Sequence, residues 1–289
     1  MASKKYFVFS GGGISGLAHI GAIKALSELE LFDPQECVGT SVGAIIAMLI
    51  CVGYSSTELI EIGKTLHFGQ YRLIEPLKLF SHFGFDSGKI LVDKLKQLIK
   101  DKLGDSEITF EELYNRTDKC LTVTGSCINT GQPIYFNRID TPQAMLYDAV
   151  RVSIGIPVYY TTVSYKDNLC VDGGIFDNYP IHRMIDKDTA HVLGIRIISN
   201  SHIEDDGKPI KGIGNYFQRL LCCLLCEIEK LRNKDCLLMD TCTINIDTRA
   251  YNALNFDILL EEKVKLIELG YQKTKEYFQI AINDSDELK

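Results

Sequence analysis

The first part of the chain alternates between short apolar runs and longer stretches with helical periodicity. Residues 4–10 carry four consecutive apolar or aromatic side chains that lead directly into three glycines, which predicts a short buried strand. Residues 15–31 gather apolar side chains on one side of a helix, residues 36–38 predict a second strand, and residues 44–52 predict an apolar helix. This β-α-β-α order with short connections is typical of an α/β fold on a parallel sheet.

The rest of the chain continues this alternation without an internal repeat, a linker or a low-complexity tract, so we expect a single domain over residues 1–289. Residues 55–116 have a mostly helical pattern and are a candidate cap. Thr109 and Glu112 fit a capping box inside that segment. A tail after residue 282 is expected to fray. The other predicted elements are helices at 87–103, 142–153, 213–234 and 257–282, strands at 120–128, 133–136, 191–198 and 242–246, and a hairpin around 166–168.

Composition narrows the function classes. Hydrophobic residues make up 46% and charged residues 24%, which argues against disorder. The net charge of −7 argues against a nucleic-acid partner and against adsorption to anionic membranes by bulk charge. The longest apolar stretch, residues 42–54, is too short for a transmembrane segment, and the apolar run after the basic start is too short for a signal peptide. We therefore expect the ten cysteines to be reduced thiols, and the protein to be cytoplasmic with peripheral contact to membranes.

Two segments admit more than one interpretation. The cluster of Cys222, Cys223 and Cys226 is best explained as buried helix packing, although S-acylation and zinc binding are alternatives. Aromatic residues are also dense between positions 66 and 85. We interpret them as core, with an acyl-chain groove or a membrane-facing cap as the alternative.

A glycine-rich loop, GGGISG, joins the first predicted strand to the first helix. It satisfies the G-x-G-x-x-G pattern of dinucleotide-binding sites. That interpretation requires an acidic residue at the end of the second strand, to hold a ribose. The second strand ends instead in Gly39, Thr40 and Ser41. The pattern therefore disfavours a dinucleotide and, by itself, indicates only a loop that lets its backbone approach a ligand.

Ser41 lies in the sequence GTSVG, the G-x-S-x-G pattern of a nucleophilic serine at a strand-to-helix turn. The start of the following helix places the Ser41 N–H toward a developing oxyanion. The alternative is that Ser41 only caps the helix. A serine nucleophile needs a base. None of the downstream histidines, His182, His191 and His202, lies at a position that strongly indicates this role.

A candidate base is Asp172 in VDGGIFDNYP, at the end of a predicted strand and followed by two glycines that leave room beside its carboxylate. The alternative is an ordinary Asp-Gly turn. A free aspartate is a weak base, so we expect burial to raise the pKa of Asp172 if it serves this role.

Together these motifs resemble the patatin-like phospholipase family. The matching segments, in the same order and spacing, are residues 9–25 (FSGGGISGLAHIGAIKA), 39–43 (GTSVG) and 171–180 (VDGGIFDNYP), within core motifs at 7–181. The resemblance implies a three-layer α/β/α sandwich around a mainly parallel sheet. It also implies a Ser41–Asp172 dyad without histidine and an oxyanion hole of Gly11, Gly12 and Gly13. The further motif glycines are Gly16, Gly39, Gly43, Gly173 and Gly174.

The function that the resemblance implies is metal-independent and cofactor-independent hydrolysis of fatty-acyl esters, of the phospholipase A or lysophospholipase type, on lipid at a membrane or micelle surface. The alternatives are a lipid transacylase and a catalytically silent lipid- or partner-binding module. The chain departs from the family at Ser15, where the family usually has Arg or Lys. Because this position is predicted to open a helix, we expect Ser15→Arg to be tolerated and to favour anionic phospholipids in a salt-dependent way.

Overall fold

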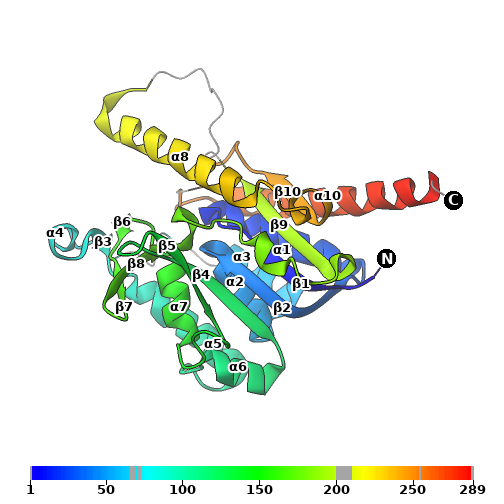
Figure 1. Cartoon of the computed structure of the whole chain (residues 1–289), viewed down its shortest axis with the longest axis horizontal. Coiled ribbons are helices and arrows are strands. Elements are labelled where there is room, and N and C mark those ends of the chain that lie inside the picture. Colours follow the sequence, from blue (N-terminus) through cyan, green and yellow to red (C-terminus); the bar gives the residue numbers. More distant parts are fainter. Residues whose placement is uncertain (1, 66–68, 70–72, 200–209, 254, 288–289) are drawn as a thin grey trace.

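A computed structural model of the protein describes residues 2–65, 69, 73–199, 210–253 and 255–287. Within these residues an eight-stranded sheet forms the centre, in the order β10-β9-β1-β2-β4-β8-β7, with β5 paired to β4 (Figure 1). A second sheet consists of β3 (Gly84–Asp86) and β6 (Val158–Tyr160). The strands of the main sheet are β1 (Lys4–Phe9), β2 (Phe32–Thr40), β4 (Cys120–Cys127), β5 (Gln132–Asn137), β7 (Val163–Tyr165), β8 (Asn168–Asp172), β9 (Val192–Ile198) and β10 (Thr243–Asp247).

The strand pairing confirms the predicted α/β class with a mainly parallel sheet. Strands β10, β9, β1, β2 and β4 are parallel to their neighbours, whereas β5, β8 and β7 pair antiparallel. Parallel neighbours need long crossover connections, which the helices supply. The helices are α1 (Leu17–Glu28), α2 (Val42–Cys51), α3 (Ser56–Thr65), α4 (Lys78–His82), α5 (Lys89–Leu103), α6 (Phe110–Thr117), α7 (Leu146–Ser153), α8 (Gly212–Asn233), α9 (Leu238–Thr241) and α10 (Leu260–Glu287).

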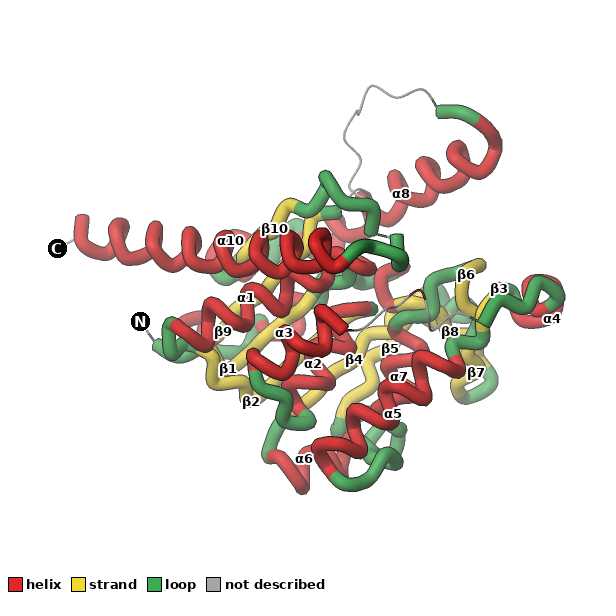
Figure 2. The backbone as a smooth tube through the Cα atoms, turned by 180° about the vertical axis from the view of Figure 1, so that it is seen from behind, coloured by secondary structure: helices red, strands yellow, loops and turns green. Residues whose placement is uncertain are grey.

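The two faces of the sheet are covered unequally. Side chains alternate along a strand, so Phe7 and Phe9 of β1 face the larger core, whereas Val8 faces the opposite side. The larger core joins the sheet to α1, α2, α3, α5, α6, α7 and α10 (Figure 2). The smaller core packs against α9 and a 3₁₀ turn, η4 (Ile181–Met184). The result is the expected three-layer arrangement with one thin layer.

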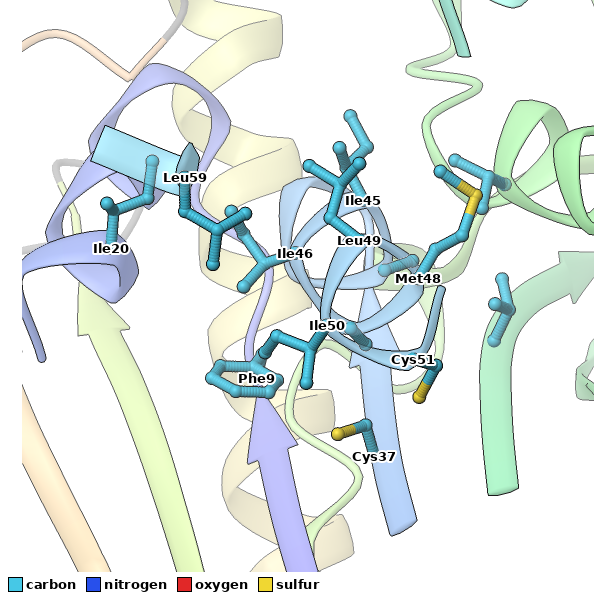
Figure 3. Packing of buried hydrophobic residues seen from close by; sticks show 14 of the residues in the cluster. Phe9, Ile20, Cys37, Ile45, Ile46, Met48, Leu49, Ile50, Cys51 and Leu59 are labelled. Carbon is cyan, nitrogen blue, oxygen red and sulfur yellow. The ribbon is translucent and has the colours of Figure 1, made fainter. Parts of the chain in front are cut away.

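Helix α2 lies at the centre of the larger core, directly behind the predicted nucleophile. Its side chain Ile46 points toward Ile20 and Leu59, and Cys51 lies near Cys37 of β2 (Figure 3). On the outer side of α1, Gly21 faces Gly270 of α10, and a Cβ at either glycine would collide with the backbone of the other helix. The start of α2 is therefore held inside a densely packed layer.

Most element positions agree with the sequence predictions, including the capping box of Thr109 and Glu112. The end of the last helix is an exception, because α10 continues to Glu287, beyond the predicted end at residue 282. The candidate cap at 55–116 is divided in space: α3 packs against α1 and α10, α5 packs against α7, and α4 projects from the end of the molecule (Figure 1). Among the described helices, none combines the length and the apolar character needed to cross a bilayer.

Candidate active site

Strand β4 brings Ser41 and Asp172 together. Its residue Thr124 pairs with Thr40 at the end of β2, and the next residue, Gly125, pairs with Asp172 at the end of β8. Strand β5 occupies the other edge of β4 over the same residues, so β2 and β8 lie end to end along one edge. Because β8 runs antiparallel to β4, the two strands point toward each other, and the residues at their ends meet.

Ser41 adopts a backbone conformation that is unusual for a residue with a side chain. Its φ of 54° and ψ of −125° belong to a sharp turn between β2 and α2. The glycines on either side are required by space, since a Cβ at Gly39 would collide with the Gly43 carbonyl, and one at Gly43 with the Phe9 carbonyl. The Ser41 side chain makes no capping hydrogen bond to α2, so the interpretation as a mere helix cap is wrong.

The Ser41 hydroxyl donates a hydrogen bond of 2.8 Å from its Oγ to Oδ2 of Asp172. The other carboxylate oxygen, Oδ1, accepts the N–H of Gly174 at 2.7 Å. Asp172 thus caps the turn after β8 with one oxygen and contacts Ser41 with the other. Burial raises the pKa of Asp172 to about 6, and the hydrogen bonds from Gly174 and Ser41 oppose the rise. At neutral pH the carboxylate is mostly ionised yet a better proton acceptor than an exposed aspartate.

The N–H groups around the glycine loop have different partners. Gly11 donates to the carbonyl of Asn178 at 3.0 Å, so its N–H is not available to a substrate in this structure. The Ser41 N–H, which we expected to face an oxyanion, donates instead to Ser153 Oγ at 2.8 Å. The N–H groups of Gly12 and Gly13 have no hydrogen-bond partner within the described part of the chain. These two N–H groups of the predicted oxyanion hole are free to donate hydrogen bonds to a ligand.

Two residues that support this geometry were not found from the sequence. Ser153 lies at the buried end of α7 and fixes the Ser41 backbone. Asn178 lies beside the glycine loop, where a Cβ at Gly11 would collide with its side-chain oxygen. Its Nδ2 donates to Glu229 of α8 at 3.3 Å, and Glu229 pairs with Arg196 of β9. Asn178 lies within the matched segment VDGGIFDNYP, which gave it no role, and Ser153 lies in no recognised motif.

A buried histidine supports the beginning of the glycine loop. His19 of α1 is fully buried, and its Nε2 lies 2.9 Å from the carbonyl oxygen of Ser10. Burial lowers the pKa of His19 to about 4, so its ring is neutral at physiological pH and donates to that carbonyl. His19 therefore holds the loop in place and does not act as a base for Ser41.

The downstream histidines have other contacts. His182 lies 3.5 Å from the hydroxyl of Tyr135, which donates to Asp177 at 2.6 Å. His191 contacts a backbone carbonyl of the N-terminal segment at 2.7 Å. His202 lies outside the described residues. Among the residues that the structure describes, no histidine hydrogen-bonds to the hydroxyl of Ser41 or to Asp172.

Three expectations about individual environments are wrong. Ser15 is fully buried in a 3₁₀ turn, η1 (Gly13–Gly16), ahead of α1, and does not open the helix, so the reason for expecting an arginine to be tolerated there is wrong: it would bury a charge. Cys223 is exposed and Cys226 is half-buried, so the cysteine cluster is not core; the side chain of Cys222 is not described. Phe80 and Phe83 of the aromatic segment are exposed as well, while residues 66–68 and 70–72 lie outside the description.

A narrow apolar pocket opens beside Ser41. A second narrow apolar pocket lies behind it, among α1, α2 and α3. The two share a wall that includes Ile14, Val42 and Ile45. Within the described parts of the chain, no group of three or more His, Cys, Asp or Glu side chains is placed to bind a metal ion. The residues that line the outer pocket are Gly13, Ile14, Ser41, Val42, Ile45, Leu91, Ile154, Ile156, Tyr160 and Phe256.

Comparison with known families agrees with this site. The family model for patatin-like phospholipase matches residues 7–185, which include the glycine loop, Ser41 and Asp172. The chain belongs to the patatin-like phospholipase family. Members of this family are lipid hydrolases, which agrees with an apolar pocket beside a serine.

Individual relatives of this patatin-like chain are distant. Uncharacterized protein R571 of Acanthamoeba polyphaga mimivirus is 28% identical over 96% of this chain and 95% of its own length. The probable lipid hydrolase 463L of Invertebrate iridescent virus 6 is 28% identical over 61% of this chain. Triacylglycerol lipase 4 of Saccharomyces cerevisiae is 26% identical over 68% of this chain. This chain spans 62% of the iridescent-virus protein and 24% of the yeast lipase.

Among solved structures, VipD from Legionella pneumophila superposes with a TM-score of 0.60 and 18% sequence identity. The match covers 95% of this chain and 66% of that one. It shows a patatin-like fold, in agreement with the expected α/β class.

Proposed function

We propose that the protein is a serine acyl hydrolase that cleaves fatty-acyl ester bonds of lipids, of the phospholipase A or lysophospholipase type. The observation that carries the proposal is the 2.8 Å hydrogen bond from Ser41 to a buried Asp172, at an apolar pocket. The strained turn around Ser41 exposes its hydroxyl to that pocket, and membership of the patatin-like family supports a lipid substrate.

The first half of the reaction acylates Ser41. Asp172 accepts the hydroxyl proton through Oδ2 as the Ser41 oxygen attacks the carbonyl carbon. Negative charge then develops on the carbonyl oxygen, where the N–H groups of Gly12 and Gly13 stabilise it, an effect of roughly 3–4 kcal/mol per donor in other hydrolases. Collapse of the tetrahedral intermediate breaks the ester bond. The proton on Asp172 passes to the leaving alcohol, and the acyl group remains on Ser41.

The second half repeats the chemistry with water. Asp172 takes a proton from the water as its oxygen attacks the acyl carbon, and the proton returns to Ser41 when the fatty acid leaves. An alcohol in place of water would give acyl transfer through the same steps. The anchored Ser153 and the buried His19 hold the nucleophile and the glycine loop in one geometry throughout, which reduces the reorganisation needed in the transition state.

The two apolar pockets would hold the acyl chain. The outer pocket begins at Ser41, so a chain attached to Ser41 lies within it. The inner pocket extends the same apolar environment past Ile14, Val42 and Ile45 toward Leu59 and Ile62 of α3. Each buried methylene stabilises a bound chain by about 0.8 kcal/mol. This arrangement favours long acyl chains over short ones.

Labelling with a fluorophosphonate probe tests the proposal. The wild-type protein should react at Ser41 alone, as mapped by mass spectrometry of the labelled peptide, and should release fatty acid from phospholipid. Ser41→Ala should do neither. A catalytically silent binding module would leave Ser41 unlabelled in a protein that remains folded by circular dichroism, and that result would refute the proposal.

A further inference from the structure

A cluster of large apolar side chains is exposed at the end of the molecule from which α4 projects (Figure 1). We call it the apolar rim. Leu77 and Phe80, on the turn and helix at its tip, are 84% and 83% exposed. Several large apolar side chains exposed on one short segment and the strand beside it indicate an interaction site, whereas single exposed hydrophobic residues do not. The rim consists of Leu73, Ile74, Leu77, Phe80, Phe83 and Val158.

All rim residues except Val158 lie on a folded arm, residues 73–86, whose two ends are joined by hydrogen bonds. The N–H of Glu75 donates to the Phe85 carbonyl at 2.7 Å, and the N–H of Thr162 donates to the His82 carbonyl at 3.1 Å. The buried carboxylate of Asp86 accepts the N–H of Leu73 at 2.9 Å and ties the start of the arm to its end. These contacts hold the apolar side chains outward in a fixed arrangement.

Two short strands connect the rim to the catalytic pocket. In β6, Val158 belongs to the rim and Tyr160 lines the pocket beside Ser41. Two residues of strand span about 7 Å, so the rim and the pocket wall are neighbours. In β6 also, Tyr159 packs against Phe256, which lines the same pocket, with ring centroids 5.6 Å apart. The rim therefore continues the apolar lining of the pocket to the surface.

The rim carries almost no net charge. Between residues 73 and 83 the charged side chains are Glu75 and Lys78, which pair with each other. His82, the remaining titratable side chain there, contacts the Ser81 hydroxyl through Nδ1 at 2.8 Å. A partner held by this surface must be bound through apolar contact. Attraction to anionic headgroups would need unpaired basic residues, which these described residues do not supply.

We propose that the apolar rim docks the protein onto the surface of a zwitterionic lipid bilayer and delivers lipid directly into the pocket at Ser41. The proposal rests on the proposed function, because a lipid substrate must leave an aggregate to reach the serine. Leu77 and Phe80 enter the boundary between headgroups and acyl chains, as the apolar residues of interfacial proteins do. The lipid then passes along β6 to Tyr160 without crossing water.

The test compares Leu77→Asp/Phe80→Asp with a control, Ile139→Asp. Ile139 is 85% exposed, as the two rim residues are. It follows the end of β5 at Asn137, which pairs with Thr122 of β4, whereas Asp172 pairs farther along β4, with Gly125. Binding to phosphatidylcholine vesicles is measured by co-sedimentation in a Ser41→Ala background, so that the vesicles stay intact. The rim variant should bind at least about tenfold more weakly, the control should bind like the parent protein, and raising the salt concentration should change neither.

Two assays of turnover in proteins with an intact Ser41 complete the test. The rim variant should lose phosphatidylcholine vesicle hydrolysis in parallel with binding, and keep its kcat/KM on a short-chain, water-soluble ester. Unchanged vesicle binding would overturn the proposal, as would equal loss on both substrates. A wild-type dimer in light scattering that the rim variant dissociates would assign the rim to a second copy of the chain instead. If the wild type hydrolyses neither substrate, the proposed function fails, while the binding assay still decides whether the rim docks.

Discussion

The catalytic centre and the apolar rim lie next to each other but are built in opposite ways. Ser41 and Asp172 are buried, and they are fixed by the local N–H of Gly174 and by two distant parts of the chain, Ser153 and strand β4. The rim is carried by one short arm and by Val158 of β6, exposes its largest side chains and is connected to the centre through β3 and β6. The difference indicates that chemistry needs a geometry determined from many sides, whereas docking needs only exposed apolar area. Changes in the two regions should therefore affect different measurements.

Removal of either dyad residue should have the largest effect. Ser41→Ala and Asp172→Asn are each expected to lower kcat/KM by about a thousandfold or more, and the double variant should be little worse, because the two residues act as a unit. Each loss should be the same on a soluble ester and on vesicles, whereas the rim variant should lose activity on vesicles alone. Additive losses in the double variant would show that Asp172 and Ser41 act independently.

The next largest effect should come from removing the hydrogen bond that fixes the Ser41 backbone. Ser153→Ala removes the acceptor of the Ser41 N–H and leaves that group buried without a partner, at a cost of about 1–3 kcal/mol. We expect kcat to fall about tenfold with little change in KM. Ser27→Ala is the matched control, since the Ser27 hydroxyl donates within its own helix, to the Ile23 carbonyl. An undiminished kcat in Ser153→Ala would mean that the turn around Ser41 is stable without this contact.

Filling the inner pocket should have a smaller effect, one that depends on the length of the acyl chain. Ile62→Phe adds volume to a half-buried side chain that lines only this pocket. Loss of room for about two methylenes should lower kcat/KM about tenfold for a palmitoyl ester and leave a butyryl ester unchanged. Ile60→Phe, half-buried on the same helix but away from both pockets, should affect neither ester. Equal effects on the two chain lengths would remove the inner pocket from the acyl site.

The sequence predicts well whatever is encoded locally. Apolar runs and helical periodicity place β1, α2 and β9, because burial against the sheet repeats with the period of each element. The strand-to-helix turn at Ser41 is equally local, since glycines at fixed offsets make it possible. The partners of the site are not local. Ser153 and Asn178 reach Ser41 and Gly11 only after the sheet has formed. The motif at 171–180 contains Asn178, but the motif does not show that this residue contacts the glycine loop.

The burial of individual side chains is also not encoded by the local sequence. Ser15 stands where a helix was expected to open, yet the 3₁₀ turn η1 buries it completely. Phe80 belongs to an aromatic segment that suggests a core, yet the arm that carries it leaves the body of the protein, and Cys223 is exposed on α8. A residue's type indicates which environment it prefers, but the tertiary fold decides which face of a helix or strand is covered by a neighbour.

The central claim is that Asp172 is the base for Ser41, and the pH dependence of kcat/KM on an uncharged, water-soluble ester tests it most directly. Burial raises the pKa of Asp172 to about 6, and only the ionised carboxylate can take the serine proton. We expect a plateau above about pH 7, a midpoint near pH 6 and a tenfold fall per pH unit below it, unchanged in His182→Gln. A rate that stays constant down to about pH 4, or a midpoint that disappears in His182→Gln, would show that Asp172 is not the base.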